Sequence, residues 1–355
     1  MALPKYSNWK DKAEGIFYGG IIGDAAGSPC EFGGRQPGEF SGRLTDDWFH
    51  KRTNRFGFEV VHEPGQHTDD GDMMLTLWRG MQKLPLGDGL IELYLAWANS
   101  GTYSLGANTR KLLHGHRTVK IYWKKFKARF PDEASREACQ TNGHLMRCAP
   151  LALIDDDEER ARSVDFDTGL TNPGRTSGKV AHIYVENVRA LLLQDHSDPS
   201  VIATVVRKHL GTEQGELATA LRDGLAPKGA FPRKVDGRKT KGWSLHGLSA
   251  AVHFGLHAET YAEGLKDVLL LGGDTDTNAC IVGSLLGARF GAEEMRRHED
   301  TAWNMRRVFE CQGSISSTAK GKATKQVRRA REYWLSTALE TLEEAAQKRC
   351  RLAQP

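Results

Sequence analysis

The chain has 355 residues, 39% of them hydrophobic, which is enough for one large or two ordinary domains with a real core. Its 49 Lys and Arg residues and 45 Asp and Glu residues give a net charge of +4, which argues against a dedicated nucleic-acid binder. No apolar run approaches the ~18 residues of a membrane span, and the start lacks the basic-then-apolar pattern of a signal peptide, so we expect a cytoplasmic protein that does not associate with membranes.

The first predicted element is a glycine-rich helix over about residues 11–30. Its glycines recur every four residues, at Gly15, Gly19, Gly23 and Gly27. Four glycines on one helical face would each cost about 1 kcal/mol relative to alanine, so we expect another backbone to approach this face closely. The polar stretch that follows, over about residues 33–59, has little periodicity and is interpreted as a long functional loop.

The tripeptide Thr-Asp-Asp occurs twice, at residues 45–47 and at residues 68–70. Mixed aromatic and basic residues without a clean period follow the first copy, so we predict a surface turn there. Asp72 and apolar residues at three- and four-residue spacing follow the second copy, so we predict that a helix begins there. Capping a helix needs one acceptor, and the surplus carboxylates repel one another unless a cation lies among them. The second copy therefore suggests a metal site.

Helical patterns dominate the middle of the chain, and strand-like alternation is nearly absent. The predicted helices cover about residues 90–98, 109–130, 143–154, 178–193, 199–210, 217–225 and 245–257. His253 and His257 in the last of these are spaced like a zinc pair, but a core or surface helix explains them better. A basic, Pro- and Gly-rich segment at about 225–242 is predicted to be mobile.

A second acidic motif, GGDTDTN, spans residues 272–278. In extended backbone the spacing of Asp274 and Asp276 points both side chains the same way, and Thr277 adds a further oxygen at the start of the next helix. Together with residues 68–70, this gives two groups of oxygen ligands, a set that suits Mg²⁺, Mn²⁺ or Ca²⁺ rather than zinc or copper. The helix that follows carries Gly283, Gly287 and Gly291, so we expect it to contact the first glycine-rich helix.

The final predicted helix covers about residues 324–348, with a solvated basic start that contains Lys325, Arg328, Arg329 and Arg331. The sequence shows neither an internal repeat nor a boundary that divides the chain. We therefore predict a single, mainly α domain over residues 11–350, with loop insertions at about 33–59 and 225–242.

Four motifs carry a family resemblance. The segments GGIIGDAAGSPCEF, PGQHTDDGDMMLTL, TNGHLMRCAPLAL and LLLGGDTDTNACIVGSLLGARFG resemble, in this order, the signature segments of the ADP-ribosylglycohydrolase family. The resemblance implies a compact, orthogonal multi-helix, all-α fold around a binuclear centre of two divalent cations, Mg²⁺ or Mn²⁺. The metal ligands that it implies are Thr68, Asp69, Asp70, Asp274, Asp276 and Thr277.

The resemblance also implies a substrate shell. Glu31 matches a glutamate over the substrate side of the metals, and Asn108, Asn142 and Gly143 match segments that hold ADP-ribose. Trp243 stands where an aromatic ring could stack on adenine, although a half-buried core position explains it equally well. This shell departs from the family pattern at Gly71, His144 and Asn172, and these departures alter the surroundings of the modified side chain.

The implied activity is hydrolysis of mono-ADP-ribose from a modified protein, with ADP-ribose as product. An N-glycosidic bond to arginine is favoured because the motifs look most like the dinitrogenase-reductase-type branch. Two cations would polarise the ribose hydroxyls and hold a water, with Asp70 or Asp276 as the base and Glu31 assisting proton transfer or positioning the substrate. The alternatives are an ADP-ribosylserine or O-acetyl-ADP-ribose hydrolase, and a catalytically silent ADP-ribose-binding homologue.

Overall fold

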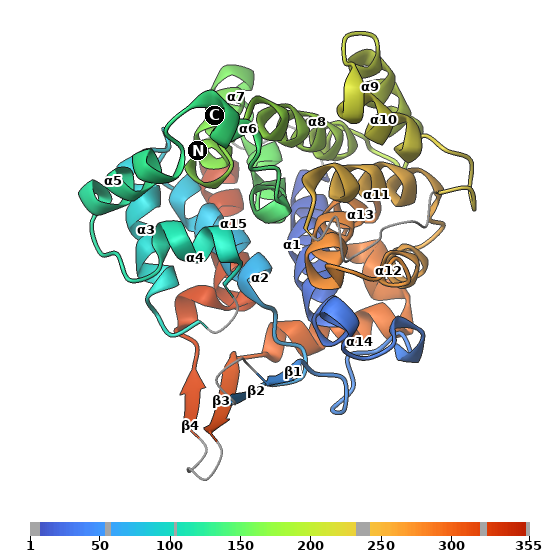
Figure 1. Cartoon of the computed structure of the whole chain (residues 1–355). Helices are drawn as coiled ribbons and strands as arrows, with labels where there is room; N and C mark the ends of the chain where they lie inside the picture. The colour runs from blue at the N-terminus through green and yellow to red at the C-terminus, as the bar shows by residue number, and fades with distance from the viewer. Residues whose placement is uncertain (1–7, 54–57, 103–104, 232–241, 320–324, 353–355) are drawn as a thin grey trace.

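The computed structural model describes residues 8–53, 58–102, 105–231, 242–319 and 325–352. Within these ranges, helices form most of the molecule, which confirms the predicted all-α class (Figure 1). The α-helices are α1 (Trp9–Gly27), α2 (Asp69–Met81), α3 (Asp88–Ala98), α4 (Ala107–Leu113), α5 (Val119–Arg129), α6 (Glu133–Glu137), α7 (Asp157–Thr171), α8 (Arg175–Leu192), α9 (Ser200–Leu210), α10 (Gly215–Gly224), α11 (Ser244–His257), α12 (Tyr261–Leu269), α13 (Thr275–Arg297), α14 (Glu299–Glu310) and α15 (Leu335–Leu352).

The helices α1 and α13 pack together through their glycines at the centre of the fold. A Cβ atom on Gly19 would lie 2.1 Å from the carbonyl oxygen of Gly283, and one on Gly15 would lie 2.2 Å from that of Gly287. No side chain fits at such separations, so only glycine allows the two backbones to come this close. The predicted contact between the two glycine-rich helices is therefore confirmed, and it joins segments more than 250 residues apart.

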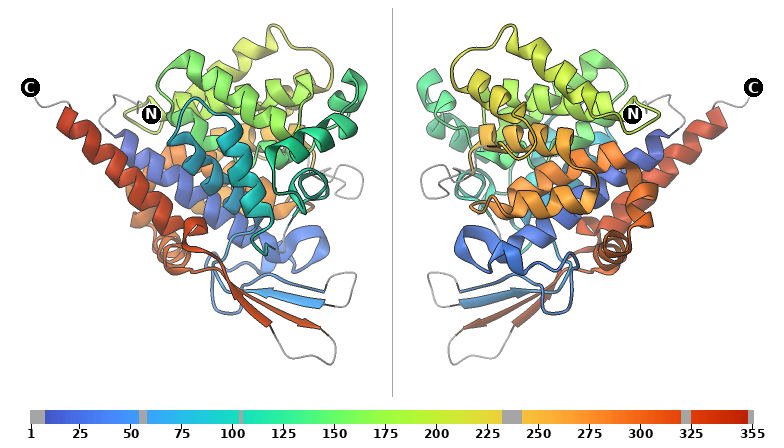
Figure 2. Two further views of the ribbon diagram at one scale, coloured as in Figure 1. Left: turned by 90° about the vertical axis from the view of Figure 1, so that its left-hand side faces the viewer. Right: turned by 90° about the vertical axis from the view of Figure 1, so that its right-hand side faces the viewer.

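A small antiparallel sheet lies at one end of the molecule, beside the helical body (Figure 2). It contains β1 (Lys51–Thr53), β2 (Phe58–His62), β3 (Ser314–Ala319) and β4 (Lys325–Arg328), in this order. Val60 pairs with Arg52 on one side and with Ser317 on the other. The sequence did not predict this sheet, because β3 is rich in serine and because its pairing with β2 is set by tertiary structure rather than by local pattern.

The predicted helix at 324–348 is wrong over residues 325–334. Instead, β4 is followed by a 3-10 turn at Arg331–Tyr333, and α15 begins only at Leu335. Arg329 lies in this stretch and is buried rather than solvated: its backbone N–H donates to the Gly313 carbonyl at 2.8 Å, and its guanidinium pairs with Asp72. These long-range contacts hold the chain out of helical geometry.

Two other predicted helices are also interrupted. The pattern at 109–130 forms α4 and α5, separated at Gly115, whose φ of +77° is incompatible with a continuous right-handed helix. The pattern at 143–154 forms two short 3-10 helices, Asn142–His144 and Ala149–Leu153.

The two predicted insertions are only partly visible. The first contains β1 and a 3-10 turn at Pro37–Glu39, while residues 54–57 lie outside the described ranges. Most of the predicted mobile segment, residues 232–241, also lies outside them. The single-domain organisation stays a prediction. In the described part of the chain, no helix has both the length and the apolar character needed to cross a membrane.

Candidate metal centre and substrate cavity

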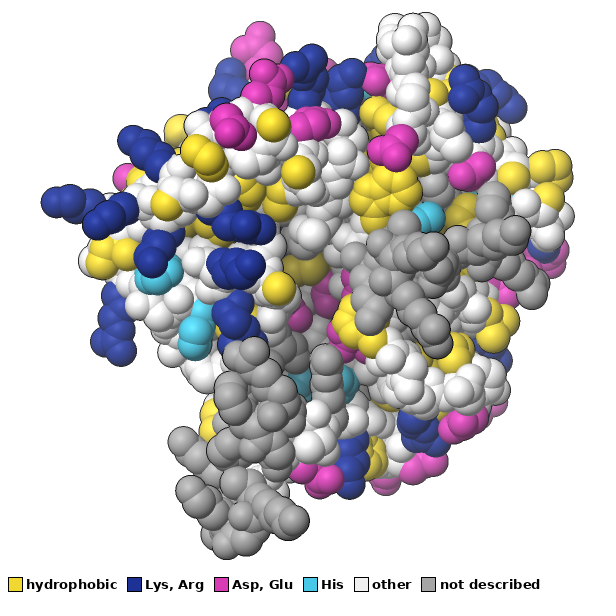
Figure 3. All heavy atoms as spheres, viewed as in Figure 1, with side chains coloured by type: hydrophobic (Ala, Val, Ile, Leu, Met, Phe, Trp, Pro, Cys, Tyr) yellow, Lys and Arg dark blue, Asp and Glu magenta, His cyan; other side chains and the backbone are white. Residues whose placement is uncertain are grey.

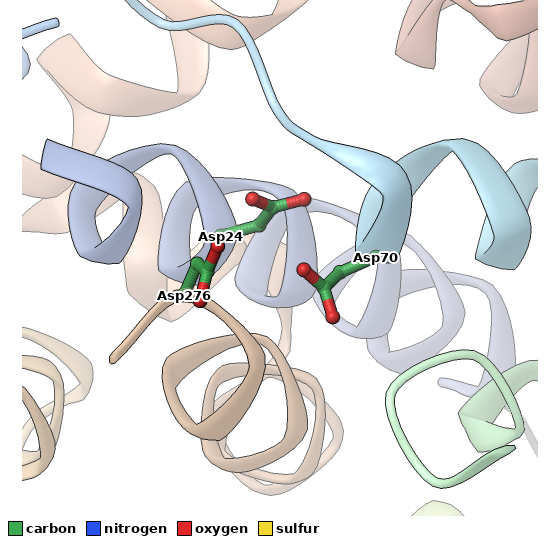
Figure 4. Close-up of side chains that lie close together, drawn as sticks. All are labelled: Asp24, Asp70 and Asp276. Carbon is green, nitrogen blue, oxygen red and sulfur yellow. The ribbon is translucent and has the colours of Figure 1, made fainter. Parts of the chain in front are cut away.

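The beginnings of α2 and α13 meet beside the C-terminal half of α1. On the face of the molecule in Figure 3, acidic side chains lie at the bottom of a hollow near the centre. Three carboxylates from three different helices converge there: Asp24 from α1, Asp70 from α2 and Asp276 from α13 (Figure 4). Each is buried and offers an oxygen within 4.8 Å of those of the other two.

Asp24 caps the start of α2, where the sequence predicted a cap from a neighbouring residue. Its Oδ2 accepts the backbone N–H groups of Thr68 (2.9 Å) and Gly71 (2.8 Å), so a residue of α1 satisfies the exposed N–H groups at the start of α2. The Thr68 side chain makes no capping bond of its own. Its hydroxyl instead lies 2.9 Å from an oxygen of Asp24 and 2.9 Å from one of Asp70, so that its single proton serves one of them at a time.

A second group of carboxylates overlaps the first. Glu31, Asp274 and Asp276 also offer oxygens within 4.8 Å of one another, so that Asp276 belongs to both groups. Glu31 lies in a break of the 3-10 helix Ser28–Gly33, where the chain leaves α1. The next residue, Phe32, donates its N–H to the Gly273 carbonyl at 2.9 Å, which ties this break to the turn before Asp274.

The carboxylates destabilise one another's charged forms. Burial, together with Asp274, raises the pKa of Asp70 to about 7. Burial and neighbouring carboxylates also raise the pKa of Asp24 and Asp276 well above the usual range. One buried oxygen, Oδ1 of Asp70, has no hydrogen-bond partner among the described residues. This oxygen-only set, with an orphaned acceptor and more charge than its surroundings balance, fits divalent cations such as Mg²⁺ or Mn²⁺.

A cavity of about 640 Å³ opens above the carboxylates, within the size range of small-ligand sites. Its floor contains five of the six predicted metal ligands: Asp69, Asp70, Asp274, Asp276 and Thr277. The sixth, Thr68, is buried beneath this floor, where its hydroxyl contacts Asp70. Asp69 accepts the N–H of Gly106 at 3.1 Å, which connects the floor to the wall formed by the start of α4.

Three predicted substrate residues, Asn108, Asn142 and Gly143, line the cavity together with Glu31. Asn142 donates from its side chain to Asp274 at 2.8 Å, and Asn108 donates to the Thr171 carbonyl at 2.7 Å. Sequence reasoning missed other lining residues, among them Phe32, His50, Thr109, Arg110 and Met146. Nothing in their local pattern distinguishes them from ordinary loop and helix residues.

The remaining predicted substrate residues, His144, Asn172 and Trp243, are not among those that line the cavity. They support the Thr141 segment from behind. His144 is fully buried, and its ring lies 3.0 Å from the Thr141 carbonyl oxygen. Asn172 donates to the same carbonyl at 2.8 Å. Trp243 pairs with Thr141 in an isolated β-bridge. Burial lowers the pKa of His144 to about 3, so its ring is neutral.

Asp72 turns away from the cluster that its neighbours form. Its carboxylate pairs with Arg329, lies 3.2 Å from His67, and accepts from Trp97 at 2.9 Å. Burial alone would raise the pKa of Asp72, but Arg329 and His67 hold it below its usual value. The surplus of acidic groups in the sequence motif is thus partly neutralised by protein, and Asp24 takes the place of Asp72 in the cluster.

The glycine that departs from the family pattern is required by local packing. A Cβ atom on Gly71 would lie 2.6 Å from the Ile21 side chain and 2.7 Å from the His67 ring. Because glycine has no side chain, it leaves room for the His67 ring.

The first Thr-Asp-Asp copy and the pair of histidines on α11 both lie outside the carboxylate cluster. The first Thr-Asp-Asp copy forms an exposed turn, as predicted. His253 and His257 lie one turn apart on α11, with ring centroids 4.7 Å apart, and within the described ranges no carboxylate or cysteine completes a three-ligand group with them.

Comparison with known proteins agrees with the sequence motifs. A family model described as ADP-ribosylglycohydrolase matches residues 5–332. The chain is 24% identical over 293 residues to ADP-ribosyl-[dinitrogen reductase] glycohydrolase of Rhodospirillum rubrum, covering 80% of this chain and 87% of that protein. A solved structure titled "ADP-ribosylglycohydrolase-related protein complex" shares the fold, with a TM-score of 0.60 and 21% identity over 85% of this chain and 98% of that one.

Proposed function

The chain belongs to the ADP-ribosylglycohydrolase family, and from this premise we propose that it hydrolyses the N-glycosidic bond between ADP-ribose and an arginine side chain of a modified protein, using two divalent cations. The observation that carries the proposal is the overlap of two carboxylate groups, which share Asp276, at the floor of a cavity of about 640 Å³. Arginine is favoured as the linked residue because the motifs resemble the dinitrogenase-reductase-type branch, and the R. rubrum relative is named as a glycohydrolase of ADP-ribosyl-[dinitrogen reductase].

The cations would be held by Thr68, Asp69, Asp70, Asp274, Asp276 and Thr277, all of which offer hard oxygen atoms. Mg²⁺ or Mn²⁺, when bound, would polarise the ribose hydroxyls and lower the pKa of a water. Asp24 has both oxygens engaged with Thr68 and Gly71, so we assign it the role of a positioning residue that fixes the start of α2.

The protein groups divide the remaining work by their position. Asp70 or Asp276, in the floor, would take the proton of the attacking water. Glu31 faces the same space as Asp274 and Asp276, where it would assist proton transfer or position the substrate. Elsewhere in the cavity lining, the amides of Asn108 and Asn142 and the guanidinium of the exposed residue Arg110 would bind the polar and anionic parts of ADP-ribose.

The test is release of free ADP-ribose from arginine-linked and serine-linked ADP-ribosyl peptides with Mg²⁺, with Mn²⁺ and with EDTA. We expect metal-dependent release from the arginine-linked peptide, abolished in the Asp274→Ala, Asp276→Ala double variant. Release from the serine-linked peptide alone would replace the arginine assignment by the serine one. Binding of ADP-ribose without release from either peptide would overturn hydrolysis in favour of a silent binding protein.

A further inference from the structure

One surface beside the cavity has a strongly one-sided charge. Between Glu92 and Asp132 the chain contains no acidic residue, and this interval includes α4 and α5. All of the Lys and Arg side chains in it are exposed, and we call this set the basic face: Arg110, Lys111, Arg117, Lys120, Lys124, Lys125, Lys127 and Arg129. Figure 3 shows Lys and Arg side chains gathered over this part of the molecule, to the left of the central hollow.

The basic face differs from the other charged surfaces in having no counter-charge. None of its eight side chains forms an ion pair with a carboxylate of the described residues. Elsewhere exposed cations are commonly paired, as Arg175 is with Glu133 and Lys208 with Glu186. On α5, Lys120 and Lys124 stand at i and i+4, a like-charge arrangement that destabilises an isolated helix. Of the basic residues on α5, only Lys127 and Arg129, in its last turn, lie where a helix favours positive charge.

The packing of α5 fixes the basic residues toward solvent. Tyr122 is fully buried, its ring contacts those of Trp123 and Phe126, and the Phe126 ring in turn contacts Phe130, just after the helix. The aromatic rings therefore fill the inner side of the helix. The lysines on its other side remain available to a partner.

The basic face begins at the mouth of the cavity. Arg110 on α4 lines the cavity, and Arg129 at the end of α5 donates from Nε to the side-chain oxygen of Asn108 at 3.2 Å. Asn108 itself lines the cavity. When a modified side chain enters this cavity, the surrounding surface of the protein that carries it must lie over the adjoining rim, which here is positive.

We propose that the basic face binds an acidic segment next to the modified residue of the protein substrate, an inference that rests on the proposed function. Opposite charge across an interface increases the association rate and orients the partners, most strongly at low salt. A protein partner fits better than single-stranded nucleic acid, because stacking on bases needs exposed rings and the rings of α5 pack inward. The net charge of +4 also argues against a dedicated nucleic-acid binder.

The experiment uses three ADP-ribosyl-arginine peptides that differ only in their flanking residues, which are acidic, neutral or basic. We expect kcat/KM to be on the order of tenfold higher for the acidic peptide than for the neutral one at 20 mM salt, and nearly equal at 300 mM, because salt screens exposed charges. The triple variant Lys120→Gln, Lys124→Gln, Lys127→Gln should lose this preference. Its turnover of the neutral peptide should not change, since none of these lysines lines the cavity.

A matched control lowers the net charge equally at distant sites. Lys83 follows the far end of α2, Arg297 ends α13, and Lys208 lies on α9, so the variant Lys83→Gln, Lys208→Gln, Arg297→Gln should keep the preference. Equal kcat/KM for the acidic and neutral peptides, or a preference that survives the triple variant, would overturn the proposal. Tight, salt-sensitive binding of a labelled 20-nucleotide strand that the triple variant loses would replace it with a nucleic-acid site.

A separate binding measurement distinguishes failure of the docking proposal from failure of the proposed function. If no peptide is hydrolysed, the proposed function fails, and fluorescence anisotropy with unmodified acidic and neutral peptides then tests the basic face alone. Salt-sensitive binding of the acidic peptide that is lost in the triple variant would support the surface. Equal binding of the two peptides would contradict it.

Discussion

The same tripeptide, Thr-Asp-Asp, adopts two different states in this molecule. At the first copy, Thr45 donates to Asp47 at 2.6 Å, which lowers the pKa of that exposed carboxylate. At the second copy, burial and Asp274 raise the pKa of Asp70 to about 7. The pKa of the third residue of the tripeptide is thus shifted in opposite directions at the two copies, and the difference comes from the segments that pack against them.

The second copy is distinguished by what distant parts of the chain contribute. Asp24 of α1 fixes the start of α2, and Asp274 and Asp276 arrive from α13. Around the first copy, Asp46 pairs with Arg307 and both aspartates face water. A motif of this kind becomes a candidate metal site only where packing brings together more buried carboxylates than the neighbouring cationic side chains neutralise.

The largest expected effect separates the two copies by function. Asp70→Asn keeps the shape of the side chain but removes a charge from the cluster, so kcat/KM for an ADP-ribosyl-arginine peptide should fall about 10³-fold at saturating Mg²⁺. The matched variant Asp47→Asn should change it by less than about twofold, since surface substitutions of this kind have small effects. Equal losses in the two variants would contradict the distinction.

The next effect concerns the contact that assembles the second copy. Gly19→Ala would place a Cβ atom 2.1 Å from the Gly283 carbonyl oxygen, so the free energy of unfolding should fall by about 2–3 kcal/mol in urea titrations. The control is Gly178→Ala on α8, where a Cβ atom meets nothing within 4 Å and should stabilise the protein by about 0.5–1 kcal/mol. A Gly19→Ala protein as stable as the parent would refute the close packing of α1 and α13.

The pH dependence should invert when cations are added. Because the pKa of Asp70 in the folded, metal-free protein (about 7) exceeds its usual value of 3.8, the folded state binds protons that the unfolded state releases between these values. In EDTA the Tm should therefore rise as the pH falls from 8 toward 5. Over this range the group adds at most about 1.4 kcal/mol per pH unit to the free energy of unfolding. In saturating Mg²⁺, which favours the charged carboxylate, the trend should be the opposite.

Asp70→Asn isolates this contribution, because its EDTA profile lacks the group that titrates. Calorimetric scans from pH 5 to 8 should show a smaller rise for the variant than for the parent. Superimposable profiles would show that Asp70 is not the source of the pH dependence.

The smallest expected effect tests the residue after the second copy. In Gly71→Thr the new side chain would collide with His67 and Ile21, and the free energy of unfolding should fall by about 1–2 kcal/mol. Adding His67→Ala should recover part of this loss by vacating the space. A double variant less stable than either single variant would show that His67 is not the obstacle.

Features with a local pattern were predictable from sequence. Glycines at four-residue spacing predicted the contact of α1 with α13, and acidic residues before an apolar period predicted the start of α2. Asp24 was missed, because a single aspartate in a glycine-rich helix looks the same whether or not it caps another helix. Its role depends on the position of Thr68, 44 residues away.

Other features depend on tertiary contacts that no local pattern contains. The helix predicted at 324–348 fails where β4 pairs with β3 and where Arg329 reaches Asp72, 257 residues away along the chain. The orientation of His144 and Asn172 away from the cavity likewise follows from their bonds to Thr141. A local sequence pattern does not show whether a polar side chain will face a ligand cavity or the protein interior.

The starts of α2 and α13 are proposed to form one site for two cations. We would measure it by titrating the metal-free protein with Mn²⁺ and following bound metal by electron paramagnetic resonance, beside the Asp276→Asn variant. We expect two Mn²⁺ per chain with a spin-coupled spectrum, and loss of that coupling in the variant, because Asp276 belongs to both carboxylate groups. A single uncoupled Mn²⁺ per chain, or an unchanged spectrum in the variant, would contradict it.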